Sequence, residues 1–116
     1  MFIRNRLKSI GFACSGIIQF FITETHAKIH AVSAIMAVCL SYYLGITVME
    51  WLLIILAIGM VIISEMINTA IEKLVDMVSP DFNKNAEFIK DVAAGAVLVA
   101  AIIALLIGGI VFIKYL

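Results

Sequence analysis

Residues 51–63 form an uninterrupted apolar run, and it continues without a turn residue into a segment that carries three carboxylates. At 100° per residue, the three carboxylates and the one amide of residues 64–76 share an arc of about 80° on this helix. These residues are Glu65, Asn68, Glu72 and Asp76. We call these four residues the acidic stripe. Ionisable groups inside a membrane are costly unless they face protein, water or a cation. The stripe therefore indicates a functional site, and a purely structural polar contact between helices is the alternative.

The overall composition places this helix in a membrane. The chain has 116 residues, of which 65% are hydrophobic and 14% charged, and its mean hydropathy is +1.19. Too little polar side chain is available to cover a soluble domain of this size. No internal repeat or linker divides the sequence, so residues 1–116 are predicted to form one integral-membrane domain.

The distribution of apolar and polar residues predicts an all-α membrane protein with four helices. Residues 4–24 mix basic and apolar side chains without a run of spanning length, which is typical of an amphipathic helix on the membrane surface. Runs of spanning length follow at about 29–48, 51–78 and 91–113. Ser79 and Pro80 end the second of these, and the polar loop that follows connects it to the third.

The basic residues predict the orientation in the membrane. Seven of the eight lie near the N-terminus or around the 79–86 loop, Lys114 is the exception, and the 45–50 turn has none. By the positive-inside rule, the N-terminus and the loop face the cytoplasm and the C-terminus lies outside. This orientation brings Glu24, the acidic stripe and the Lys90-Asp91 pair to the same side of the membrane.

Carboxylates, an amide and a lysine together suit a magnesium-bound nucleotide. Mg²⁺ takes oxygen ligands and keeps several waters while it bridges carboxylates to substrate phosphates, and lysine supplies a point charge for phosphate oxygens. The sequence contains no glycine-rich phosphate loop and no soluble-kinase motif. The residues alone therefore permit phosphoryl transfer without specifying it.

Two longer motifs point to one family. The sequence E-x-x-N-T-A-I-E-x-x-V-D at 65–76 and K-D-x-A-A-G-A-V-L at 90–98 strongly resembles the prokaryotic integral-membrane diacylglycerol kinases, which include undecaprenol kinases. Gly11, Gly16, Glu24 and the segment 28–30 also fit this family, so the resemblance covers nearly the whole chain.

The resemblance implies a homotrimer of protomers with a surface helix and three spanning helices. It also implies ATP-dependent phosphorylation of a membrane lipid alcohol by in-line transfer of the γ-phosphoryl group, with Mg²⁺ as cofactor and active sites shared between protomers in the bacterial inner membrane. Glu65 matches the general base and Asn68 a polar site position. Glu24 and Glu72 match the metal ligands. The nucleotide-side positions are Asp76, Lys90 and Asp91, with the loop residues Asp81 and Asn83 as further contacts.

Two choices stay open at this point. The motifs do not separate undecaprenol from diacylglycerol as the acceptor. A small oligomeric cation channel or transporter with a carboxylate-lined pore would also explain acids in the second spanning helix, but it explains Glu24 and the Lys90-Asp91 pair poorly. We expect His26 and His30 to be surface or packing residues, and Lys73 to contact lipid headgroups or the cytoplasm.

Overall fold

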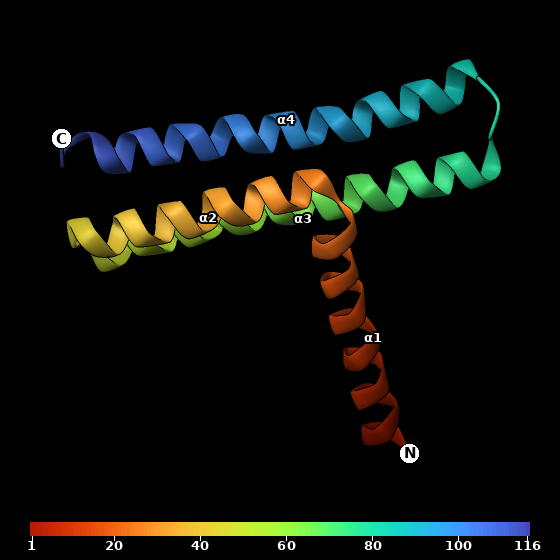
Figure 1. The fold of residues 1–116 in the computed structure, drawn as a ribbon, viewed down its shortest axis with the longest axis horizontal. Helices are drawn as coiled ribbons and strands as arrows, with labels where there is room; N and C mark the ends of the chain where they lie inside the picture. Colours follow the sequence, from red (N-terminus) through yellow and green to blue (C-terminus); the bar gives the residue numbers. More distant parts are fainter.

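The computed structural model describes all 116 residues and contains helices only. They are α1 (Phe2–Thr23), α2 (Thr25–Leu44), α3 (Val48–Val78) and α4 (Lys84–Ile113). Helices α2, α3 and α4 run along the long axis of the molecule, and α1 turns away from them (Figure 1). Each of the three aligned helices is long and apolar enough to cross a membrane, which confirms the predicted all-α architecture with three possible spans.

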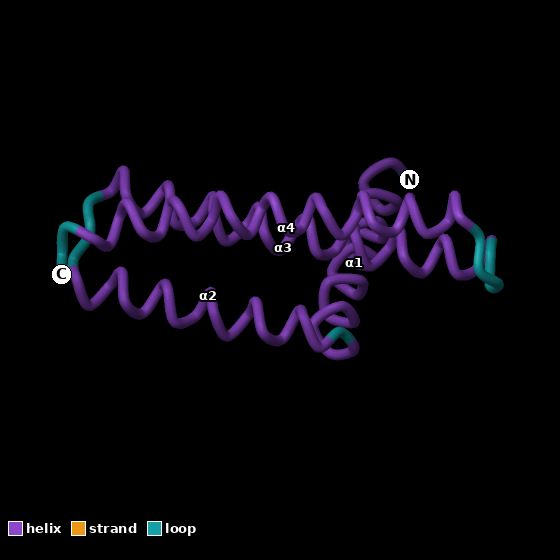
Figure 2. The backbone as a smooth tube through the Cα atoms, turned by 90° about the horizontal axis from the view of Figure 1, so that it is seen from above, coloured by secondary structure: helices purple, strands orange, loops and turns teal.

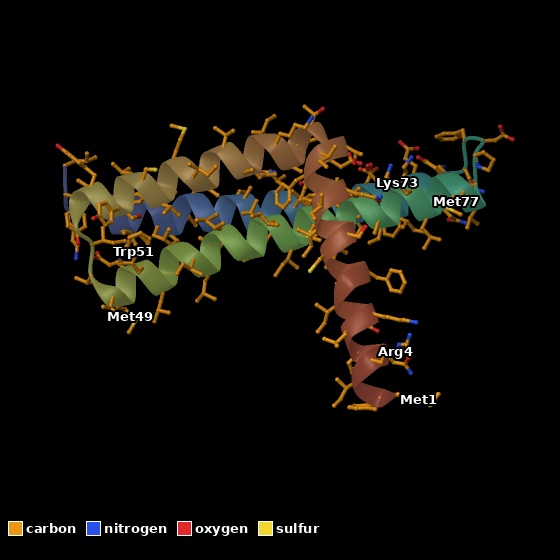
Figure 3. All side chains as sticks on the ribbon, turned by 60° about the horizontal axis from the view of Figure 1, so that its bottom comes forward. Met1, Arg4, Met49, Trp51, Lys73 and Met77 are labelled. Carbon is orange, nitrogen blue, oxygen red and sulfur yellow. The ribbon has the colours of Figure 1, made fainter.

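A single residue separates α1 from α2. Glu24 has extended backbone angles, φ −95° and ψ 124°, and therefore ends one helix and precedes the next. This break lets α1 leave the bundle, and Figure 3 shows Met1 and Arg4 at the end of α1 far from the other helices. Among the α1 side chains only Phe20 is buried. Its placement on a membrane surface stays a prediction.

The turn between α2 and α3 covers residues 45–47, whereas the predicted turn extended to Glu50. Helix α2 ends at Leu44, four residues before the predicted limit, because Gly45 adopts a left-handed conformation with φ 63° that favours glycine. Helix α3 already begins at Val48. The Thr47 hydroxyl accepts from the Glu50 backbone N–H, and the Glu50 carboxylate accepts from the Thr47 N–H, which forms a capping box. Glu50 thus belongs to the helix and not to the turn.

Helix α3 is longer than a membrane crossing requires. Its 31 residues correspond to about 46 Å at 1.5 Å per residue, whereas the hydrocarbon core is about 30 Å thick. It ends at Val78, directly before Ser79 and Pro80, as predicted. An untilted α3 therefore cannot lie wholly within the hydrocarbon core, and the acidic stripe occupies its second half.

Helix α4 begins seven residues before the predicted start at Asp91. The Asn83 side-chain oxygen accepts from the backbone N–H groups of Asn85 and Ala86 at 2.8 and 3.2 Å, so this residue caps the helix. The polar segment 84–90 is therefore helical, and the Lys90-Asp91 pair lies about two turns inside α4 and not at its start. The polar residues of this segment therefore belong to α4 and do not mark its beginning.

The three aligned helices bury few side chains against one another. Helices α3 and α4 overlap in Figure 2, and α2 runs beside them. Only 13 of the 116 residues are buried, and a small apolar cluster of Ile46, Ile54 and Val111 lies near the α2–α3 turn. The apolar side chains left exposed need lipid or other protein around them, which agrees with a membrane protein.

A polar cluster joins α3 to the C-terminus at the end opposite the acidic stripe. Glu50 is 8% exposed, and its carboxylate lies 2.8 Å from Lys114 Nζ and accepts a hydrogen bond from the Tyr115 hydroxyl. This hydrogen bond raises the pKa of Tyr115 above its ordinary value of 10.0, because the neutral phenol is the form that donates. The cluster gives a buried carboxylate several donors and ties the ends of α3 and α4 together.

Removal of the Tyr115 hydroxyl tests this contact. We expect Tyr115→Phe to lower the midpoint of thermal unfolding in detergent by a few degrees at neutral pH, because Glu50 loses a donor. The contribution is present at neutral pH and is lost as the pH rises through the raised pKa of Tyr115. The difference between wild type and variant should therefore shrink in alkaline buffer.

Tyr42→Phe is the matched control, because Tyr42 lies near the same end and is 83% exposed. It should unfold like the wild type at each pH. Equal midpoints for the two tyrosine variants at neutral pH would contradict a stabilising role for the Tyr115 contact.

Candidate active site

Glu65 is the most enclosed carboxylate of the acidic stripe. It is 7% exposed, and it lies on α3 opposite the first turns of α2. Its only ionisable partner is His30, whose Nε2 lies 3.5 Å from Glu65 Oε2. A carboxylate that is shielded from water and faces an imidazole is a suitable proton acceptor. The structure thus places the predicted base in a protected position.

Asn68 and Glu72 form the middle of the stripe. They are one turn apart on α3, and Asn68 Nδ2 donates to Glu72 Oε1 at 3.2 Å. The other polar atom of the amide, Asn68 Oδ1, is buried and has no hydrogen-bond partner. Buried polar atoms are normally paired, so an unpaired oxygen beside a carboxylate indicates a place for a donor or a cation.

Asp76 and Lys90 connect the outer part of the stripe to α4. Lys90 Nζ lies 2.6 Å from Asp76 Oδ1, and both side chains are partly exposed. An exposed ion pair contributes little to stability, so its main effect here is to hold the ammonium group beside α3. The two predicted nucleotide-side residues are therefore brought together, although they lie 14 positions apart in the sequence.

Glu24 reaches the same region from the break between α1 and α2. Its Oε1 lies 3.6 Å from Lys73 Nζ, on the turn of α3 next to Glu72. Figure 3 shows Lys73 on α3 close to the crossing with α1. Lys73 thus lies beside a predicted site residue, and its 70% exposed side chain leaves the expected contact with lipid headgroups or the cytoplasm a prediction.

The remaining predicted nucleotide contacts lie outside these pairs. Asp81 and Asp91 are exposed, and neither carboxylate has a partner. Asn83 is exposed, and its side-chain oxygen is engaged as the cap of α4. Their contacts with a nucleotide stay predictions.

Sequence reasoning missed His30 as a partner in the site. The spacing was the single available signal. His30 lies six residues after Glu24, and α2 runs antiparallel to α3, so His30 and Glu65 lie at similar heights along the two helices. Which face of α2 meets Glu65 depends on how the two helices are rotated against each other. The sequence of either helix alone does not contain that rotation.

Two apolar cavities reach the site from different sides of α3. One, of about 950 Å³, lies between α3 and α4 and includes Ser64, Asn68 and Phe88 in its lining. The other, of about 660 Å³, lies between α2, α3 and α4 and includes His30 and Ser33. Glu65 lines neither cavity. Apolar space therefore meets the polar site at Asn68 and at His30.

The donor atoms fit a hard divalent cation that keeps part of its water shell. No three His, Cys, Asp or Glu side chains come together in the protomer as a complete metal site. Carboxylates and the unpaired Asn68 oxygen are ligand types that Mg²⁺ accepts, and this ion typically binds proteins through one or two carboxylates plus phosphates and water. The residues present therefore match a Mg²⁺ site in which the protein supplies only some of the ligands.

Fold and site together define a class of protein. It is a small membrane protein with three helices able to span the bilayer and an acidic, oxygen-rich site at one end of them. The sequence matches the family described as Prokaryotic diacylglycerol kinase over residues 11–112. The chain belongs to this family.

Curated relatives carry two names. The chain is 36% identical to "Undecaprenol kinase" of Bacillus subtilis (strain 168), an alignment that covers 97% of this chain and 95% of that protein. It is 34% identical to "Diacylglycerol kinase" of a Synechocystis strain, over 90% of this chain and 61% of that protein. The corresponding protein of Escherichia coli (strain K12) is 28% identical, over 86% and 82%. The named relatives are lipid kinases.

Proposed function

We propose that this protein transfers the γ-phosphoryl group of ATP to the hydroxyl group of a membrane lipid alcohol. The observation that carries the proposal is the convergence of the family motif residues from three elements. The acidic stripe lies on α3, Lys90 of α4 pairs with Asp76, and Glu24 lies at the break before α2. Family membership and the names of the relatives support the same reaction class.

Glu65 is proposed to act as the general base. As the lipid oxygen attacks the γ-phosphorus, Glu65 takes the hydroxyl proton, the new oxygen–phosphorus bond forms, and the bond to the bridging oxygen of ADP breaks. Such transfers depend mainly on positioning and on neutralisation of phosphate charge. The low exposure of Glu65 supports the role, because bulk water does not compete with the lipid hydroxyl for contact with a shielded carboxylate.

Lys90, held by Asp76, and Asp91 are proposed to lie on the nucleotide side. The Lys90 ammonium group can exchange its ion pair with Asp76 for an ion pair with a phosphate oxygen. Glu24 and Glu72 would hold Mg²⁺, with Asn68 Oδ1 as a neighbouring oxygen donor. When bound, the ion would neutralise phosphate charge and align the triphosphate.

Undecaprenol is proposed as the acceptor, with diacylglycerol as the competing candidate. The undecaprenol kinase is 36% identical to the chain and is aligned over 95% of its own length, and the diacylglycerol kinases cited above are 28–34% identical. The apolar cavities on both sides of the site suit either lipid chain. The distribution of basic residues supports an inner-membrane location with the site in the cytoplasm and the C-terminus outside.

The deciding experiment is a transfer assay with purified protein. Labelled Mg-ATP is incubated with undecaprenol, with diacylglycerol or with no added lipid, and label is counted in the organic phase. Faster transfer to undecaprenol supports the proposal, and faster transfer to diacylglycerol reverses the choice of acceptor. If no lipid is labelled and the protein conducts cations in liposomes, the channel alternative replaces the kinase.

The base is tested by Glu65→Gln, which keeps the size of the side chain and removes its basicity. We expect kcat to fall by about 100-fold or more, while Mg-ATP binding is retained, because only proton removal is lost. Glu87→Gln is the matched control, since Glu87 is exposed in the first turn of α4. A kcat for Glu65→Gln near that of the control would remove Glu65 from this role.

The metal assignment is tested by magnesium titration at a fixed ATP concentration. Glu72→Gln should need more Mg²⁺ for half-maximal activity and should have a lower maximal rate, because one negative ligand is replaced by a neutral one. Glu87→Gln should titrate like the wild type. An unchanged Mg²⁺ requirement in Glu72→Gln would count against the assignment.

A homotrimer with shared sites is proposed from the family resemblance and from the exposed stretches of the protomer. If one site takes residues from two chains, inactive variants altered in different segments can complement each other. Pairs chosen from Glu24→Ala, Glu65→Ala and Asp91→Ala are unfolded, mixed in equal amounts and refolded together. Activity should return to at most about a quarter of the wild-type value, since each of two contributing residues is intact half the time.

Wild-type protein refolded alone is the control for recovery. If it regains activity and every mixed pair stays as inactive as its parents, each site lies within a single protomer.

A further inference from the structure

We propose that His30 is a positioning residue for Glu65, holding the carboxylate in the orientation that takes the proton of the acceptor. The inference rests on the proposed kinase function and adds a residue to its site. It starts from one contact: His30 Nε2 on α2 lies 3.5 Å from Glu65 Oε2 on α3.

Three other acids of the region already have side-chain partners of their own. Glu24 faces Lys73, Glu72 accepts from Asn68, and Asp76 is paired with Lys90. For Glu65 the only polar partner is His30. Removal of the imidazole would therefore leave a carboxylate of 7% exposure without any side chain to orient it.

The position of His30 between a cavity and the base supports the same role. His30 lines the cavity of about 660 Å³ between α2, α3 and α4, whereas Glu65 does not. The imidazole thus lines this apolar space and also contacts Glu65. Its 24% exposed side chain is also more accessible than the 9% exposed side chain of Glu65.

The separation of 3.5 Å suits a contact that becomes shorter during the reaction. Hydrogen bonds in active sites are often long before substrate binds and tighten in the reactive complex. An imidazole N–H can donate to the carboxylate from a short, rigid side chain, and this fixes the carboxylate plane better than water would. A carboxylate that is not held in place would lower the rate of phosphoryl transfer, because a misplacement of about 1 Å can reduce the rate about 100-fold.

The test compares His30→Phe, which keeps a ring for packing, with His30→Gln, which keeps an N–H donor. His26→Phe is the matched control, because His26 is on the same helix, is exposed and forms no ion pair or side-chain hydrogen bond. Each protein is reconstituted in lipid, and kcat and both KM values are measured with Mg-ATP and undecaprenol. We expect His30→Phe to lower kcat by about 10- to 100-fold with an unchanged KM for Mg-ATP. His30→Gln should recover part of the loss, and His26→Phe should match the wild type.

A double-mutant comparison separates positioning from packing. If His30 acts through Glu65, His30→Phe should cause little further loss when Glu65→Gln is already present. The inference is overturned if His30→Phe has wild-type kcat, or if it lowers kcat by the same factor in both backgrounds.

A spectroscopic readout keeps the inference testable without turnover. The chain has two histidines, so a sample labelled with ¹⁵N-histidine gives signals from two imidazoles, which His26→Phe assigns. Glu65→Gln should change the ring nitrogen shifts of His30 and leave those of His26 unchanged. Unchanged His30 shifts would overturn the inference. If the wild type phosphorylates no lipid, the proposed function fails, and this measurement alone decides whether His30 holds Glu65.

Discussion

The site depends on the register of one long helix against the membrane. The capping box at Thr47 fixes where α3 begins, and about twenty residues from there cross a hydrocarbon core of about 30 Å. A hydrocarbon core that begins at Val48 would end near Ile67 on this count, which would place Glu65 at its edge and Glu72 and Asp76 beyond it. The order of the stripe along the helix therefore matches the proposed chemistry. In the proposed reaction, a lipid hydroxyl would meet the first acid from the membrane side, and a nucleotide would meet the later acids from water.

Partners from neighbouring elements orient three acids of the site. Glu65 faces α2, Asp76 faces α4, and Glu24 at the helix break faces Lys73 of α3. Partly exposed pairs of this kind add little stability, so they cannot be what holds the helices together. They restrict where the side chains point, and a phosphoryl transfer that relies on positioning needs that restriction.

The sequence predicted the parts of the structure that depend on one segment at a time. Helix number, the end of α3 at Val78 and the common face of the acidic stripe follow from hydropathy, from Pro80 and from helical periodicity. The start of α4 was missed, because the polar segment before Asp91 was read as a loop although Asn83 caps a helix there. The contacts of Glu65 and Glu50 were also missed. Both join residues of different segments, and the rotation that brings His30 or Tyr115 to them is set by packing between helices.

The two ends of the bundle differ in a way that explains where a nucleotide could enter. At one end, Glu50 is enclosed by Lys114 and Tyr115, and the short α2–α3 turn closes the helices together. At the other end, α2 begins only at Thr25 and α1 turns away. The end of α3 and the beginning of α4 therefore project beyond α1 and α2 (Figure 1). This projecting pair carries the Asp76–Lys90 contact and the exposed Asp91. A protomer alone leaves these groups open on one side, so a bound nucleotide would need a neighbouring chain or the membrane surface to enclose it.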